Sequence, residues 1–90
     1  MSLLDAIDNF YERLVAEAID EARQPEDTED FLADVICVAL NRLPPRYYRH
    51  AIDMRFYLPD QELDEMKQKV RVEVAQARDY VLRRQRGDEC

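Results

Sequence analysis

Apolar residues recur three and four positions apart over three stretches of the chain, which is the spacing of amphipathic helices. The first stripe consists of Leu3, Ile7, Phe10, Tyr11, Leu14, Ala18, Ile19 and Ala22. The second consists of Leu32, Val35, Ile36, Ala39, Leu40 and Leu43. The third consists of Leu63, Met66, Val70, Val74, Ala77 and Val81. The pattern therefore predicts three main helices and an all-α, or nearly all-α, fold.

Short polar segments mark where the first two helices begin. Ser2 stands three residues before Asp5, which resembles a capping signal, so the first helix should run from Leu3. The segment 24–27 has no periodicity and contains a proline, so we expect a short acidic connector there. Either Asp27 or Thr28 could cap the second helix.

Prolines bound the region between the second and third helices. The ring of Pro44 disfavours helical geometry at Leu43, so the second helix should stop there. Residues 54–58, Met-Arg-Phe-Tyr-Leu, could form one short extended segment. The third helix should begin after Pro59 and end near Gly87, the only glycine of the chain.

The length of 90 residues suits a single domain that spans residues 1–90. A domain of this size buries only roughly 60–65% of the surface that its unfolded chain exposes, so its stability as a monomer would be modest. Three apolar stripes are more than so short a chain can cover internally. We therefore expect a homodimer.

The charge of the chain limits its partners. There are 20 acidic and 13 basic residues, for a net charge of −7. Broad binding to nucleic acid or to an acidic membrane needs a positive field, so neither is expected. The N-terminal residues lack the basic and apolar regions of a signal peptide, and no apolar window is long enough to span a membrane. We expect a cytoplasmic protein.

The residues that carry most enzyme chemistry are scarce. Ser2 is the only serine, no glycine-rich phosphate loop is present, and Cys37 lies on a predicted helix far in sequence from His50. Cys37 and Cys90 form no disulfide framework; we expect a packed thiol and a frayed terminal one. These features predict a non-enzymatic protein without a cofactor.

The stretch from Asp34 to Tyr47 reads D-V-I-C-V-A-L-N-R-L-P-P-R-Y. It resembles the signature of the late-competence protein ComFB family, D-V-x-x-x-A-L-N-x-L-P-P-x-Y. The resemblance implies a small, helical, dimeric and non-enzymatic regulator that signals to a protein partner. Members of the family, notably the cyanobacterial ones, are receptors for cyclic dinucleotides, chiefly cyclic di-GMP, so the resemblance implies such a ligand.

The chain departs from some members of this family at one point. Some relatives from Gram-positive bacteria carry C-x-x-C just before the Asp-Val pair and bind zinc, whereas Thr28 and Phe31 occupy the matching positions here. Neither side chain supplies a thiolate ligand. We therefore expect no metal site.

Positive charge gathers in residues 41–55, which we call the double-proline corner. A cyclic dinucleotide presents phosphates and purines, which call for planar bidentate donors, a flat stacking partner, and a carboxylate or amide for the base edge. Arg46, Tyr47 and Asp53 are of these types, and Pro44 and Pro45 restrict the backbone before them. The predicted ligand-binding residues are Asn41, Arg42, Arg46, Tyr47, Arg49, Asp53 and Arg55.

Structural roles for the same residues fit the sequence too. Tyr47 and Tyr48 could each be a half-buried core residue, and Asn41 could cap the end of a helix. Arginines among many carboxylates often serve as surface ion-pair partners. The main alternative function is a dimeric adaptor that binds another protein and no small molecule.

Overall fold

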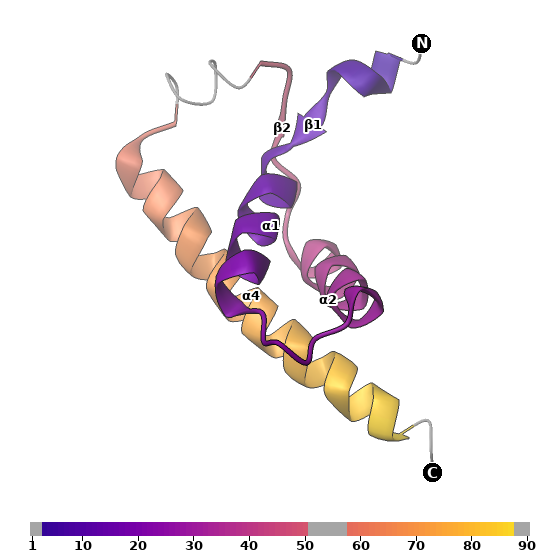
Figure 1. Ribbon diagram of the computed structural model, residues 1–90. Helices are drawn as coiled ribbons and strands as arrows, with labels where there is room; N and C mark the ends of the chain where they lie inside the picture. Colours follow the sequence, from indigo (N-terminus) through magenta and orange to yellow (C-terminus); the bar gives the residue numbers. More distant parts are fainter. Residues whose placement is uncertain (1–2, 51–57, 88–90) are drawn as a thin grey trace.

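The computed structural model describes residues 3–50 and 58–87 (Figure 1). Its elements are a 3₁₀ helix (Leu3–Ala6), β1 (Asp8–Asn9), α1 (Phe10–Ala22), α2 (Glu29–Arg42), β2 (Tyr47–Tyr48) and α4 (Asp60–Gly87). The described residues are therefore mostly helical, with three α-helices and one small two-stranded sheet. This confirms the nearly all-α prediction.

The three predicted stripes meet in one core. Helices α1 and α2 contact each other, and both pack on the long helix α4 (Figure 1). The buried residues are Tyr11, Leu14, Val15, Ile19, Phe31, Leu32, Val35, Ala39, Leu43, Leu58, Met66, Val70, Val74, Ala77 and Val81. The third stripe lies in this core except for Leu63, which is half-buried against it. None of the helices in residues 3–50 and 58–87 combines the length and apolar character that a membrane span requires.

The first helix begins later than the stripe predicts. Asn9 is its N-cap, with φ −96° and ψ 119°, and the Asn9 side chain accepts a hydrogen bond from the Tyr11 backbone N–H. The residues before it form the 3₁₀ helix and β1, and Leu3 and Ile7 are 90% and 40% exposed. The prediction of a helix from Leu3 is wrong because Asn9 is held extended in the small sheet; Ser2 lies outside the described residues.

The second helix has the ends that the sequence predicts. Thr28 is its N-cap, and the Thr28 Oγ1 accepts a hydrogen bond from the Phe31 N–H at 3.0 Å. Leu43 is its C-cap with φ −103° and ψ 137°, the extended geometry that a following proline favours. Thr28 is therefore the capping residue, and Asp27 is free for another role.

Asp27 ties the α1–α2 connector to α4. Its Oδ2 accepts hydrogen bonds from the Gln24 N–H and from Arg78 Nη1, both at 2.8 Å, and its Oδ1 accepts one from Arg78 Nη2 at 3.3 Å. The Arg78 guanidinium also lies 5.2 Å from the centre of the Phe31 ring. The hydrogen bonds from Arg78 and then from Gln24 lower the pKa of the Asp27 carboxyl below 3.8.

Two other predictions concern residues near α2 and α4. Cys37 is exposed, so the expectation of a packed thiol is wrong. It stands two residues from both Val35 and Ala39, which puts it about 200° around the helix from the buried face.

The predicted extended segment 54–58 falls outside the described residues except for Leu58, and so does Cys90.

Candidate functional site

The small sheet fixes residues 46–48 of the double-proline corner against the start of α1. Strands β1 and β2 pair antiparallel, with Asn9 opposite Tyr47. The Phe10 N–H donates to the Arg46 carbonyl at 2.7 Å, and the Arg46 N–H donates to Asn9 Oδ1 at 2.9 Å. The backbone of Arg46 and Tyr47 is thus held in place by residues far away in sequence.

Asn9 serves two backbone segments with one side-chain oxygen. Its Oδ1 accepts from the Tyr11 N–H at 3.2 Å and from the Arg46 N–H at 2.9 Å. A carbonyl oxygen has two acceptor positions, so both hydrogen bonds can be made at once. Sequence reasoning missed this residue. Asparagine is a preferred N-cap residue, so the sequence could have indicated its capping of α1 but not its contact with Arg46.

The Arg46 side chain reaches α4. Its Nη1 lies 2.8 Å from Glu62 Oε1, and the two side chains are 46% and 36% exposed. Tyr11 lies buried nearby: burial raises the pKa of its hydroxyl, the Arg46 charge lowers it, and the Glu62 charge raises it again. An anion that binds Arg46 would therefore have to share the guanidinium with Glu62 or replace it. No sequence signal pointed to Glu62.

The two tyrosines of β2 differ in exposure. Tyr48 is half-buried, and its ring packs edge-on against Phe10 with centroids 5.9 Å apart and an interplanar angle of 82°. Tyr47 is 65% exposed. Successive residues of a strand point to opposite sides, which accounts for the difference. Of the two alternatives left open by the sequence, packing holds for Tyr48, whereas Tyr47 presents its ring to solvent.

Arg42 lies apart from Arg46. The Arg42 guanidinium sits 5.1 Å from the centre of the Tyr80 ring, whereas Arg46 contacts Glu62. Positions 62 and 80 are about 27 Å apart along the axis of α4 at 1.5 Å per residue. The structure therefore does not bring these two arginines to one point within the chain.

The other predicted residues are exposed or outside the described range. Asn41 and Arg49 are exposed, and the Asn41 side chain makes no hydrogen bond within residues 3–50 and 58–87, which gives no support to a capping role. Asp53 and Arg55 lie outside the described residues. No group of three His, Cys, Asp or Glu side chains in the described part of the chain could hold a metal ion.

The geometry thus selects a smaller candidate site than the sequence did. Within residues 41–50 there are three arginines and no acid, and the described acid that contacts one of them is Glu62. The backbone of β2 presents Tyr47 with Arg46 before it and Arg49 two residues after it, all three exposed. This arrangement can stack a planar ring and donate paired hydrogen bonds to an anion.

Comparisons with known proteins identify one family. Residues 8–85 match the family model described as late competence development protein ComFB. The matched range includes α1, α2, the small sheet and most of α4. Searches of the curated proteins and of the solved structures found no match.

Proposed function

The chain belongs to the late competence development protein ComFB family, which indicates a competence-related regulator, and from this premise we propose a second-messenger receptor for cyclic di-GMP. The proposed receptor is cytoplasmic and dimeric, has no enzymatic activity, and passes its signal to a protein partner. The proposal adds the ligand, the location and the mode of action to what the family membership establishes.

The exposed ring of Tyr47 is the observation that carries the proposal. A tyrosine that is 65% exposed beside two exposed arginines contributes little to the core. Its ring can stack on a guanine, and stacking is a sequence-tolerant contact of about 1–3 kcal/mol per base. Because Asn9 and Phe10 already hold the backbone of Arg46, directly before Tyr47, few degrees of freedom would be lost on binding.

The arginines of the corner would have different roles. Arg46 is the proposed main donor, since a planar guanidinium can pair with two phosphate oxygens or with the two Hoogsteen acceptors of guanine. On binding, Arg46 would exchange Glu62 for the ligand. Arg49 is the proposed second donor. We assign no direct contact with this ligand to Arg42 or to the neighbouring Asn41, because the Arg42 guanidinium lies over the Tyr80 ring of α4 and away from Arg46.

A thermal-shift panel tests the proposal. Cyclic di-GMP, cyclic di-AMP, cyclic AMP-GMP and their linear counterparts would each be added to the protein up to about 100 µM, a concentration that reveals micromolar binding as a raised Tm. We expect cyclic di-GMP to raise the Tm more than the others. If it produces no shift at that concentration, the protein is not a receptor for this dinucleotide.

An adaptor that binds only protein is the second candidate. The favouring observation is that Arg46 and Arg42 already have partners within the chain, Glu62 and Tyr80, as purely structural arginines would. Such a protein should be indifferent to every nucleotide of the panel. The thermal-shift experiment therefore separates the two candidates.

A further inference from the structure

The ion pair between Arg46 and Glu62 lies where three elements meet. Arg46 directly precedes β2, Glu62 belongs to the first turn of α4, and Tyr11 belongs to the first turn of α1. The charges of Arg46 and Glu62 both act on the Tyr11 hydroxyl, which places the three side chains in one neighbourhood. Residues that are far apart in the sequence thus form one polar cluster at the edge of the core.

The hydroxyl of Tyr11 has no partner in this cluster. Tyr11 is only 5% exposed, yet its hydroxyl makes no hydrogen bond within residues 3–50 and 58–87. The buried side-chain oxygen that lacks a partner in this part of the chain is Glu73 Oε2, so the Tyr11 oxygen keeps some contact with solvent. A buried tyrosine usually finds a partner for its hydroxyl. Because burial raises the pKa of the Tyr11 hydroxyl above its ordinary value of 10.0, this group is a protonated donor at neutral pH.

Asn9 fixes Tyr11 and Arg46 relative to each other. Its Oδ1 accepts hydrogen bonds from the backbone N–H groups of both residues, at 3.2 Å from Tyr11 and 2.9 Å from Arg46. One oxygen therefore anchors the backbone of both donors. The guanidinium brings a positive charge and several N–H donors, and the phenol brings one O–H donor. Such a set, held in place by the backbone, is suited to a small anion with several acceptor oxygens.

Glu62 supplies an anion from within the chain. Its Oε1 lies 2.8 Å from Arg46 Nη1, and the Glu62 and Arg46 side chains are 36% and 46% exposed. An ion pair so open to water is weak, so it can open at small cost. In the described residues Glu62 makes no hydrogen bond to Tyr11, so the carboxylate satisfies the guanidinium and leaves the hydroxyl unused.

We propose that Tyr11 and Arg46 form an anion site that Glu62 occupies in the free protein and that a phosphate group enters by displacing Glu62. Tyr11 is then a binding residue, and Glu62 is an internal competitor that lowers the affinity of the site. The inference rests on the proposed function for the source of the phosphate, cyclic di-GMP, whereas the site itself can be tested with inorganic pyrophosphate. Filling the site breaks the ion pair to α4, so α4 loses one contact with the corner when ligand is bound.

Pyrophosphate titrations at constant ionic strength test the site. NMR would follow the Arg46 Nε–H group and the Tyr11 amide in the wild type, Glu62→Gln and Tyr11→Phe, with circular dichroism to confirm that each variant is folded. We expect Glu62→Gln to bind pyrophosphate about two- to fivefold more tightly, since it removes a weak competing pair. Tyr11→Phe should bind about tenfold more weakly, since it loses a hydrogen bond to a charged acceptor.

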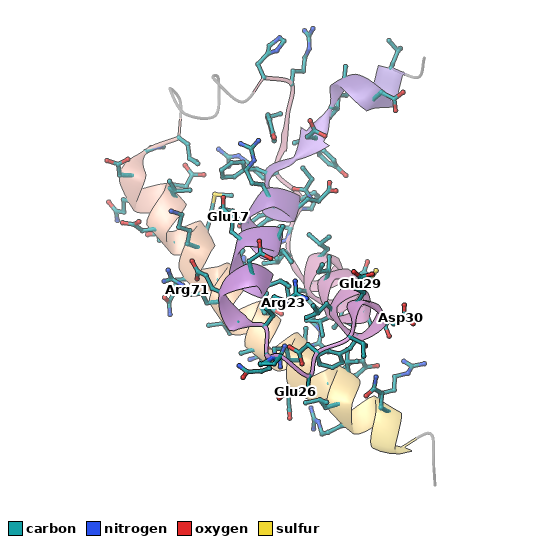
Figure 2. All side chains as sticks on the ribbon, in the orientation of Figure 1. Glu17, Arg23, Glu26, Glu29, Asp30 and Arg71 are labelled. Atoms are coloured by element: carbon teal, nitrogen blue, oxygen red, sulfur yellow. The ribbon has the colours of Figure 1, made fainter. Side chains whose placement is uncertain are left out.

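Two control variants make the same chemical changes elsewhere. Glu17→Gln neutralises an exposed carboxylate farther along α1, labelled in Figure 2, and Tyr80→Phe removes a hydroxyl that contacts Arg84 on α4. Both should bind pyrophosphate as the wild type does. If Glu17→Gln tightened binding as much as Glu62→Gln, the effect would come from net charge alone, and Glu62 would not be a competitor.

The remaining outcomes separate this inference from the proposed function. If pyrophosphate moved neither NMR signal in the wild type and in Glu62→Gln, the cluster would not be an anion site. Unchanged binding by Tyr11→Phe would remove Tyr11 from the site. If pyrophosphate bound with the expected ranking while cyclic di-GMP gave no thermal shift, the anion site would stand and the receptor function would fail. If cyclic di-GMP raised the Tm but Glu62→Gln bound both ligands like the wild type, the receptor would stand and the competition would be disproved.

Discussion

At the scale of single residues, the candidate site depends on side chains whose contacts are with residues far away in the sequence. Arg46 has its backbone held by Asn9 and Phe10 and its guanidinium held by Glu62. Its backbone is therefore fixed while its partly exposed side chain can exchange one anion for another. This combination distinguishes Arg46 from an ordinary surface arginine.

We predict that Arg46→Ala weakens the binding of cyclic di-GMP about ten- to a hundredfold, since a charge-assisted hydrogen-bond pair contributes roughly 1.5–3 kcal/mol. Arg46→Lys should restore little, because an ammonium group cannot make the paired contact. Isothermal titration calorimetry would measure the Kd of each variant. Normal binding by Arg46→Ala would show that the site has been assigned to the wrong residue.

Three further variants complete this series: one control arginine and the two tyrosines of β2. Arg23→Ala removes an exposed arginine remote from the corner and should leave Kd unchanged. Tyr47→Ala should weaken binding while leaving the Tm nearly unchanged, because the ring is exposed. Tyr48→Ala should lower the Tm, since it removes the contact with Phe10. A larger loss of stability for Tyr47→Ala than for Tyr48→Ala would contradict the stacking role.

At the scale of elements, the connector between α1 and α2 is joined to α4 by one ion pair. The side chains of Asp27 and Arg78 are only 7% and 20% exposed, so this pair is better shielded from water than the other described pairs. The contact of Arg78 with the Phe31 ring adds a second link to α2. Loss of the pair should therefore weaken the packing of α1 and α2 on α4.

The pair should make stability depend on pH in the acid range. The pKa of Asp27 is lowered by folding, so its contribution is present above the unfolded value of 3.8 and is lost as the pH falls through the lower folded value. We predict that Asp27→Asn destabilises the protein at pH 7 and that the difference from wild type shrinks steadily below pH 3.8. Urea unfolding at a series of pH values would measure this difference.

Glu26→Gln is the matched control for Asp27→Asn. It removes a neighbouring exposed carboxylate that has no ion pair in the described residues, and it should change stability little at any pH. A difference between Asp27→Asn and wild type that stayed constant down to pH 2 would mean that the carboxylate charge does not stabilise the connector.

At the scale of the whole molecule, the question is what holds so small a domain together. The two positions at which some relatives have cysteines have structural roles here: Thr28 caps α2, and Phe31 is buried in the core under Arg78. The three helices share one apolar core. Packing and association are therefore the proposed sources of stability.

We predict that the purified protein folds without zinc. Elemental analysis should find far less than one zinc ion per chain, and a chelator such as EDTA should not change the helical circular dichroism signal or the Tm. One outcome would contradict this prediction. One zinc ion per chain, lost together with helicity when the chelator is added, would show that a metal site exists after all.

The sequence by itself determined that the chain forms three main helices and where α2 begins and ends. These features depend on residues a few positions apart: the spacing of apolar side chains, the hydroxyl of Thr28 before α2, and the ring of Pro44 after it. The start of α1 was misjudged because the stripe continues through Leu3 and Ile7, whereas Asn9 is held by a strand that comes much later in the chain.

Only the tertiary structure decided which arginines and tyrosines of the corner can act together. Asn9 meets Arg46 across 37 positions, and Asp27 meets Arg78 across 51. No local pattern encodes such contacts, because they follow from how the helices pack once their apolar faces are buried. That packing separates Arg42 from Arg46 along α4, and it turns Tyr48 inward and Tyr47 outward. It also places Glu17 and Glu21 of α1 across from Lys67 and Arg71 of α4.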